Sequence, residues 1–273
     1  MKVLLTGASG RLGRAFVEHT NPSWELDARS HSELDICDKK AVETAVSGAD
    51  MVLNCAAYTD VDAAESNVDT ARDVNTIGPY NLAEATEAAG SLLVHLSTDY
   101  VFDGEKSTPY TEHDPAGPLS VYGRSKLAGE QAVMQLNPEH IIIRTAWLYD
   151  HTGPSFLHLL LSLASRPEVG VSNDQYGSPT YVPHLVSGIE RVVESGLRGT
   201  VHLAGSGGAS RYELACCLYE KMGFETKLLP AKTSDFPSPA TRPAYSILDT
   251  SRSPEIHLPP WEEGLEAFVR HTK

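Results

Sequence analysis

The sequence predicts an α/β fold: a Rossmann-like doubly wound parallel sheet with a smaller, interwoven C-terminal substrate-binding lobe. Two observations predict it. Short apolar runs alternate with longer amphipathic stretches through the first two thirds of the chain, and a glycine-rich turn directly follows the first run. Runs that are apolar on both faces are typical of buried parallel strands, which helices connect in right-handed crossovers. A dinucleotide-binding sheet combines both features.

The apolar runs and the stretches between them define the expected elements. Strands are expected at Val3–Thr6, Glu25–Ala28, Met51–Cys55, Leu92–Ser97 and Ile141–Thr145. The amphipathic stretches predict helices at Leu12–His19, Lys39–Val46, Thr70–Ala89 and Val121–Gln135. Together they predict an NAD(P)-binding domain at residues 1–150.

After Trp147 the rhythm weakens and proline recurs. We expect a strand at Thr200–Leu203 and helices at Arg211–Met222 and Trp261–His271. The proline-rich stretch 228–245 is interpreted as an ordered loop that crosses a site, with a disordered linker as the alternative. Residues 151–273 are therefore predicted to form mainly a substrate-binding lobe, some segments of which return to the large domain.

Composition excludes several classes of function. The 273 residues carry a net charge of −14, which disfavours the broad cationic surface that nucleic acid requires. The four cysteines and the histidines show no metal-ligand spacing, so reduced thiols and no metal site are expected. The N-terminal apolar run is too short for a signal peptide, and no run is long enough for a membrane span. We expect a cytoplasmic protein without a nucleic-acid or membrane partner.

The glycine-rich turn "TGASGRLG" predicts a dinucleotide site. Gly7, Gly10 and Gly13 lie between an apolar strand and a helix. Glycine permits a tight turn and a close approach of backbone N–H groups to a pyrophosphate, and the helix N-terminus adds positive potential. A purely structural turn is the alternative.

The end of the second expected strand should indicate the cofactor type. An acid there suits the ribose 2′-hydroxyl of NADH, whereas a cation suits the 2′-phosphate of NADPH. Asp27 is the candidate acid, but strand alternation can point it elsewhere, and Arg29 lies where the strand ends. The sequence favours NADPH, with NADH as the alternative and a solvated loop cation as the other interpretation of Arg29. Asp35 and Ile36 are expected to line the adenine pocket.

A tyrosine and a lysine at helical spacing predict the chemistry. Tyr122 and Lys126 share one face of the helix that begins after Ser120, a suitable N-cap. We expect the ammonium to lower the pKa of the phenol and to hydrogen-bond the nicotinamide ribose. Thr98, at the end of an expected strand, can hold a substrate carbonyl oxygen. The combination predicts a carbonyl–alcohol oxidoreductase.

The sequence resembles the extended short-chain dehydrogenase/reductase superfamily and, within it, the dTDP-4-dehydrorhamnose reductase family. The matching stretches run nearly end to end: "TGASGRLG", "ELDICD", "NCAAYTDVDAAES", "VHLSTDYVFDG", "PLSVYGRSKLAGE", "RTAWLY", "DQYGSPT" and "TRPAYSILDTS". The resemblance implies an NAD(P)H-dependent reductase of a 4-keto-6-deoxy nucleotide sugar, of the type that converts dTDP-4-dehydrorhamnose to dTDP-rhamnose, and leaves room for a homodimer.

The resemblance also implies three groups of site residues. The catalytic set is Thr98, Tyr122 and Lys126, with Tyr122 as proton donor to the C4 oxygen of the sugar. The cofactor would lie along Gly10, Arg11, Leu12, Ala56, Ala57 and Tyr58, with Asn75 supporting it from behind. Asp99, Tyr100 and Trp147 would border the sugar, and Arg242 would suit the diphosphate. For Trp147 a core role, and for Arg242 a surface salt bridge, are the alternatives.

Two departures from the family pattern concern the substrate. Asp150 stands where the family often has glycine, and Ser155 stands where an amide is usual. They leave the sugar and the base open. Two other interpretations also remain: a non-catalytic regulatory subunit resembling that of methionine adenosyltransferase, and a nucleotide-sugar epimerase or dehydratase. A dehydratase usually carries Asp-Glu after the threonine, whereas here Asp99 is followed by Tyr100.

Overall fold

A six-stranded parallel sheet forms the larger part of the molecule. The computed structural model describes residues 1–19 and 21–273. The strand order is β10-β5-β4-β3-β1-β2, and every pair is parallel. The strands are β1 (Lys2–Thr6), β2 (Glu25–Arg29), β3 (Met51–Asn54), β4 (Leu92–Thr98), β5 (His140–Thr145) and β10 (Gly199–His202). The predicted doubly wound sheet is confirmed, and the chain reverses its winding between β1 and β3.

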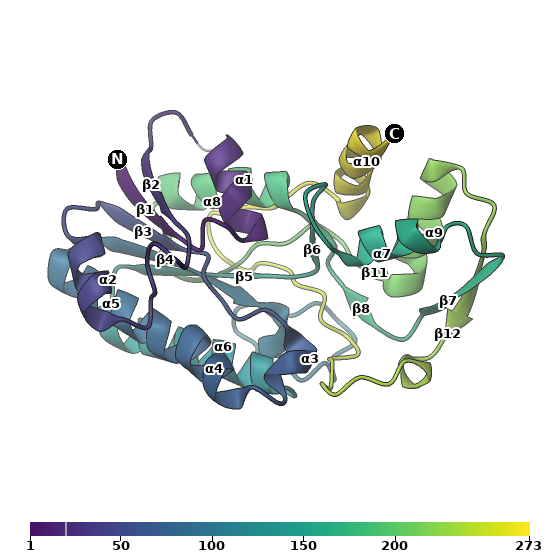
Figure 1. Cartoon of the computed structure of the whole chain (residues 1–273), viewed down its shortest axis with the longest axis horizontal. Helices are drawn as coiled ribbons and strands as arrows, with labels where there is room; N and C mark the ends of the chain where they lie inside the picture. The colour runs from purple at the N-terminus through teal and green to yellow at the C-terminus, as the bar shows by residue number, and fades with distance from the viewer. Residues whose placement is uncertain (20) are drawn as a thin grey trace.

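Helices cover both faces of the sheet (Figure 1). On one face lie α1 (Arg11–His19) and α8 (Val182–Glu194). Phe16 and Leu185 are among the side chains that pack there with the sheet's Leu5 in one apolar cluster. The other face carries α2 (Lys39–Val46), α5 (Gly78–Ala89) and α6 (Val121–Leu136), whose side chains pack against Leu4. The central strands, such as β3 and β5, are therefore buried on both faces, as their apolar sequences predicted, whereas the edge strand β2 is largely exposed and corrects that expectation.

The single helix predicted at Thr70–Ala89 is interrupted. The structure has α4 (Val68–Arg72), a π-helical turn η1 (Asp73–Ile77) and then α5. The wider turn buries Asn75 beside α6. Gly78 begins α5 where a Cβ atom would lie 2.3 Å from Ile36 Cδ1. The interruption thus brings a polar side chain between the segment after β3 and α6, and π-turns often occur where such a side chain is needed.

A second, smaller layer follows residue 150. It contains α7 (Phe156–Leu163), α9 (Arg211–Met222), α10 (Trp261–Thr272) and the parallel pair β7 (Glu168–Ser172) and β12 (Lys227–Ala231), around an apolar core of its own. The shorter elements are α3 (Val61–Ala64), η2 (Asp99–Val101), η3 (Thr233–Asp235), β6 (Leu148–Tyr149), β8 (Tyr176–Gly177), β9 (Thr180–Tyr181) and β11 (Ala209–Ser210).

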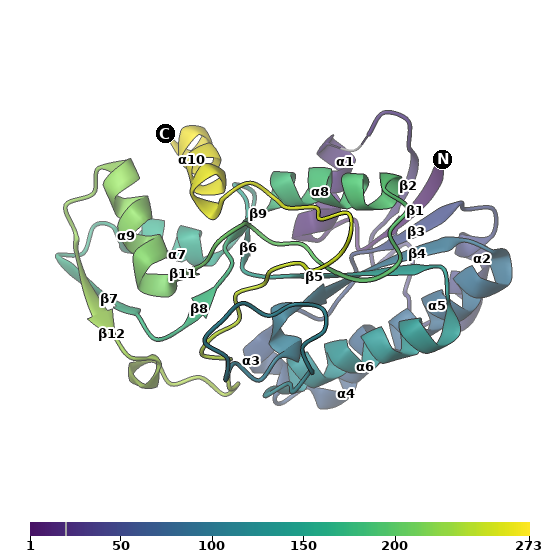
Figure 2. The same cartoon turned by 180° about the vertical axis from the view of Figure 1, so that it is seen from behind.

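Several segments after Trp147 also differ from expectation, among them α7 and β7, which were not predicted. The stretch 228–245 begins not as a loop but inside β12, because it pairs with β7. Helix α8 was not predicted, because prolines precede and begin it. It packs on the large sheet, and the chain then adds β10 to the edge of that sheet. Figure 2 shows the segment before α10 crossing between the two layers. The division at residue 150 remains a prediction. Across the described residues, no helix has both the length and the apolar character needed to cross a membrane.

Candidate active site

The glycine turn is as tight as its sequence predicts. Gly7 has a φ of 71°, and a Cβ atom there would lie 2.5 Å from the backbone nitrogen of Ala56. A Cβ atom on Gly13 would lie 2.3 Å from the carbonyl oxygen of Gly7. The turn therefore leads directly into α1 at the carboxyl ends of β1 and β3. Side chains at Gly7 and Gly13 would fill the space around the turn. Because glycine leaves that space open, backbone N–H groups can approach the pyrophosphate of a dinucleotide.

The two residues after the turn play different parts. The Leu12 side chain is buried in the core, so only its backbone can face a ligand. The Arg11 side chain points toward the segment that follows β6. Its NH1 atom is 2.6 Å from Asp150 Oδ1, and NH2 donates to the carbonyl of Pro154. The unusual Asp150 thus pairs with the cation of the turn.

At the end of β2, Asp27 and Arg29 lie side by side. Arg29 Nε is 2.6 Å from Asp27 Oδ1 and NH2 is 3.0 Å from Oδ2, and both side chains are exposed. Asp27 raises the pKa of Arg29 through this hydrogen bond. Strand alternation places both on one face. Asp35 accepts a hydrogen bond from the Cys37 amide, whereas Ile36 is buried.

The segment after β3 runs along the same edge. Ala56, Ala57 and Tyr58 are half-buried there. Asn75 holds Tyr58 by its backbone: Tyr58 N is 2.8 Å from Asn75 Oδ1, and Asn75 Nδ2 is 3.0 Å from the Tyr58 carbonyl. Asn75 Nδ2 also lies 3.0 Å from Ser125 Oγ on α6. Asn75 therefore ties the segment to the helix from behind.

Tyr122 and Thr98 come together at the end of β4. Ser120 caps α6, accepting from Gly123 N at 3.1 Å, and Tyr122 lies in the first turn. Burial raises the pKa of Tyr122, and the neighbouring Thr98 hydroxyl opposes that rise. Asp99 and Tyr100 raise it further. Two hydroxyl groups thus converge at a strand end, where doubly wound sheets bind ligands.

Lys126 does not have the expected effect on the pKa of Tyr122. Its Nζ atom donates to the carbonyl of Leu96 at 2.6 Å, and the side chain is buried. The predicted lowering of the Tyr122 pKa by this ammonium is wrong for the structure, because burial raises that pKa and Lys126 is not among the groups that shift it. Burial also lowers the pKa of Lys126 to about 8, although Glu130 and Cys55 raise it.

Close helix packing sets these positions. A Cβ atom on Gly123 would lie 2.2 Å from the Tyr100 carbonyl oxygen, and one on Gly129 would lie 2.2 Å from the Asn75 carbonyl oxygen. Both glycines let α6 approach the strand end and the π-turn. Their place in "YGRSKLAG", beside the tyrosine and the lysine, was the signal available in the sequence.

Asp99 and Tyr100, two of the residues expected to border the sugar, lie next to Tyr122. Asp99 is buried and accepts from Ser246 Oγ at 2.6 Å and from Thr98 Oγ1 at 3.1 Å. Burial raises the pKa of Asp99 to about 6, against those hydrogen bonds. The rings of Tyr100 and Tyr122 are 5.7 Å apart. Trp147 has a φ of 45°, a left-handed conformation that is uncommon for a bulky residue.

A cavity of about 830 Å³ is lined by the second layer and by Asp62 of α3. Thr98, Asp99, Tyr100 and Tyr122 do not line it. Burial raises the pKa of Tyr100, and Arg211 and Arg242, which line the cavity, oppose that rise. Its apolar wall includes Phe156, Leu159, Val171 and Phe236, of which Leu159 and Phe236 are exposed. Its polar lining includes Asp62, Gln175, Thr233, Ser238, Arg211 and Arg242. Such a combination suits a ligand with an apolar ring and an anionic group.

Arg242 and Asp62 form an ion pair in this cavity. Arg242 NH2 is 2.8 Å from Asp62 Oδ2, and NH1 is 3.0 Å from Oδ1. Arg242 lowers the pKa of Asp62 to about 2 through this hydrogen bond. Asp62 and Arg211 were missed by the sequence reasoning, although Asp62 lies within the "NCAAYTDVDAAES" stretch.

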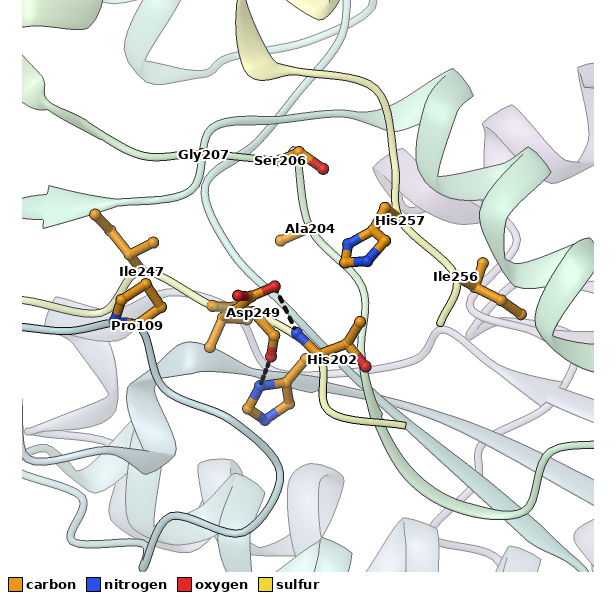
Figure 3. A pocket seen from close by; sticks show the side chains of 11 residues that line it. Pro109, His202, Ala204, Ser206, Gly207, Ile247, Asp249, Ile256 and His257 are labelled. Atoms are coloured by element: carbon orange, nitrogen blue, oxygen red, sulfur yellow. Dashed lines mark hydrogen bonds between the residues drawn. The ribbon is translucent and has the colours of Figure 1, made fainter. Parts of the chain in front are cut away.

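A second cavity, of about 170 Å³, offers less chemistry (Figure 3). Its polar side chains bond within the protein. His202 Nδ1 is 3.0 Å from the carbonyl oxygens of Tyr110 and Asp249, and Ser206 Oγ donates to Leu258 O at 2.6 Å. His257 Nε2 is 3.2 Å from Glu255. The larger cavity is therefore the candidate site. No group of metal-ligating side chains occurs in residues 1–19 and 21–273.

Fold and site together indicate a dinucleotide-binding protein of the short-chain dehydrogenase/reductase type, with a large cavity near the candidate residues. The sequence profile described as "RmlD substrate binding domain" matches residues 1–273. A dTDP-4-dehydrorhamnose reductase from Mycolicibacterium smegmatis is 39% identical over 277 residues, which cover 98% of this chain and 85% of the relative.

Solved structures agree. A dTDP-4-dehydrorhamnose reductase from Clostridium acetobutylicum superposes with a TM-score of 0.96 at 37% identity, covering 100% of this chain and 99% of the other. The Bacillus anthracis enzyme of that name, in complex with NADP, gives 0.95 at 37% identity and covers 99% of both chains. The chain belongs to the dTDP-4-dehydrorhamnose reductase family.

Proposed function

We propose that this protein reduces a 4-keto-6-deoxy nucleotide sugar with NADPH, as dTDP-4-dehydrorhamnose reductases do with dTDP-4-dehydrorhamnose. The observation that carries the proposal is the convergence of the Tyr122 and Thr98 hydroxyl groups at the end of β4, beside a glycine turn and a cavity with two arginines. Family membership supports the same activity.

Each part of the site has a role in the proposed reaction. Bound NADPH supplies the hydride that the ketone carbon accepts. Thr98 holds the ketone oxygen by a hydrogen bond, and Tyr122 gives that oxygen its proton, so that the ketone becomes an alcohol and the tyrosine a phenolate. The Lys126 ammonium would donate a hydrogen bond to the nicotinamide ribose and so help to position the cofactor. Asp99, Tyr100 and Trp147 orient the sugar ring.

The cofactor site would use backbone more than side chains. Gly7, Gly10 and the amides that follow would hold the pyrophosphate, with Arg11 beside it. Ala56, Ala57 and Tyr58 would line the nicotinamide half, and Asp35 and Ile36 the adenine half. Arg29 would accept a 2′-phosphate by exchanging Asp27 for it, which supports NADPH over NADH.

A tyrosine substitution tests the proposal. Tyr122→Phe removes the proton donor and keeps the ring, so reduction of dTDP-4-dehydrorhamnose should fall by roughly a thousandfold, within the range for a lost general acid. NADPH oxidation measures turnover, and NADPH titration should show nearly unchanged affinity. Unchanged turnover in Y122F would rule out Tyr122 as the acid.

The same assay separates the two other interpretations. An epimerase keeps its nicotinamide cofactor in the protein and consumes none, and a regulatory subunit consumes none with any ketone. Stoichiometric NADPH oxidation by the wild type, with the product's configuration assigned by NMR, would exclude both.

We also expect a cytoplasmic protein and a homodimer. Light scattering of the purified chain measures the oligomeric state.

A further inference from the structure

Arg211 is one of two cations in the large cavity to which the reaction above gives no role, the other being Arg242. It lies at the start of α9, where Ser210 and Glu213 form a capping box: Glu213 N is 3.0 Å from Ser210 Oγ, and Ser210 N is 2.7 Å from Glu213 Oε2. The cap fixes the backbone of Arg211. Its side chain lines both the large cavity and a small adjoining one beside Trp147.

The guanidinium lies over two aromatic rings. Its central carbon is 3.5 Å from the centre of the Trp147 ring and 4.8 Å from that of Phe156. The indole has little freedom, because a Cβ atom on Gly177 would lie 2.4 Å from it. Arg211 therefore contacts both Trp147, which borders the proposed sugar site, and Phe156 of the apolar wall.

The charge of Arg211 is not neutralised by a close partner. Arg242 pairs with Asp62, but no carboxylate within residues 1–19 or 21–273 lies within ion-pair distance of Arg211. Burial lowers the pKa of Arg211 to about 10, while Tyr100 and Asp99 raise it, so the side chain stays cationic at neutral pH. A half-buried cation stacked on aromatics keeps its N–H edge available for an anion.

We propose that Arg211 binds the diphosphate of the nucleotide sugar through its N–H edge while its flat face holds Trp147 against the sugar. Arg242 was the cation expected from sequence, but its charge is already compensated by Asp62. Arg211 thus links recognition of the nucleotide to placement of the sugar. This inference rests on the proposed function, since it names the anion as the diphosphate of that substrate.

Equilibrium binding tests this without turnover. The dissociation constants of dTDP and of thymidine, which lacks phosphate, are measured by calorimetry for the wild type and Arg211→Met. Loss of a charge-assisted bond should weaken dTDP roughly 10- to 100-fold and thymidine by less than about threefold. Met keeps apolar contact with Trp147. If Arg211 had a merely structural role, the substitution would change the affinities for dTDP and for thymidine equally.

Two further variants complete the design. Arg211→Lys keeps the charge without the planar fork, so it should restore much of the dTDP affinity while kcat stays low because Trp147 loses its support. Arg270→Gln, an exposed arginine on α10, is the matched control and should change neither. Thermal melting and NADPH affinity show whether each variant is folded.

The outcomes separate this inference from the proposed function. If R211M binds dTDP as tightly as the wild type while the wild type reduces the keto sugar, the role of Arg211 is wrong and the reductase stands. If the wild type reduces no keto sugar but its dTDP affinity depends on Arg211, the anion site stands and the reductase does not. Equal loss of dTDP and thymidine binding in R211M also overturns the inference.

Discussion

Lys126 shows how burial sets the working range of a single residue. Its ammonium lies against the Leu96 carbonyl rather than in solvent, and burial lowers its pKa to about 8. In the proposed reaction the cationic form is the stronger hydrogen-bond donor to the nicotinamide ribose. We therefore expect the charge of Lys126 to limit the reaction on the alkaline side.

The pH dependence of reduction should reflect this group. We expect kcat/KM for the keto sugar to be constant at lower pH and to fall as pH rises through about 8, because Lys126 loses its proton there. Initial rates of NADPH oxidation across the pH range measure it. Lys126→Arg should move the fall to higher pH, and a profile that stays flat above that pKa would contradict the role.

At the scale of residues, the sequence predicted which side chains form the candidate site better than it predicted how buried those side chains are. The spacing of Tyr122 and Lys126 was enough to place both on one face of α6, because helical geometry is local. The rise of the phenol's pKa was not predictable, since it depends on burial by segments far apart in the chain. Arg211 was missed for the same reason: its contact with Trp147 joins residues from different layers.

At the scale of elements, α6 is fixed to the sheet by a buried polar group. Glu130, two turns after Tyr122, accepts from Ser97 Oγ on β4 and pairs with Arg144 on β5 at 2.7 Å. Glu130 is fully buried and Arg144 nearly so. The group sets the register of α6 and therefore the position of Tyr122 beside Thr98.

Removing one partner should cost much stability. Glu130→Gln leaves the Arg144 charge buried without compensation, and the free energy of unfolding should fall by about 3–5 kcal/mol. Urea denaturation measures it. The control is Glu168→Gln, which breaks the exposed pair with Lys227 and should cost less than about 1 kcal/mol. An E130Q protein as stable as this control would show that the buried pair does not fix the helix.

The elements that the sequence missed have physical reasons. Helix α8 begins with Val182 and Pro183, and proline in the first turn is compatible with a helix although it is typical of loops elsewhere. The π-turn in the Thr70–Ala89 stretch leaves no local signature, because it is set by packing against α6. Strands with continuous apolar sequence were predicted to within a few residues.

At the scale of the whole molecule, charged groups connect distant segments. Glu112 accepts from His202 N at 2.8 Å on β10 and from Ser251 N at 2.9 Å in the segment before α10. Burial would raise the pKa of Glu112, but these N–H groups lower it to about 2. The carboxylate thus joins the edge of the sheet to the returning chain.

Stability in acid should depend on this carboxylate. Its pKa is lower in the folded state than in the unfolded one, so its contribution is present above the ordinary value of 4.5 and is lost as pH falls through about 2. Glu112→Gln should therefore be less stable than the wild type at neutral pH, with the difference shrinking in acid. Denaturation at several pH values measures it, and a difference independent of pH would contradict the assignment.

Trp147 lies where β5 leaves the large sheet and β6 begins, and its left-handed backbone is among the costlier conformations for such a residue. Its carbonyl accepts from Thr180 N at 3.2 Å, so the conformation persists only while neighbouring segments hold it. Activity should consequently be lost at temperatures below the unfolding transition that circular dichroism records, and it should return on cooling. The rate at which a stored preparation loses activity would then depend on this junction between β5 and β6 and not on the stability of the apolar core.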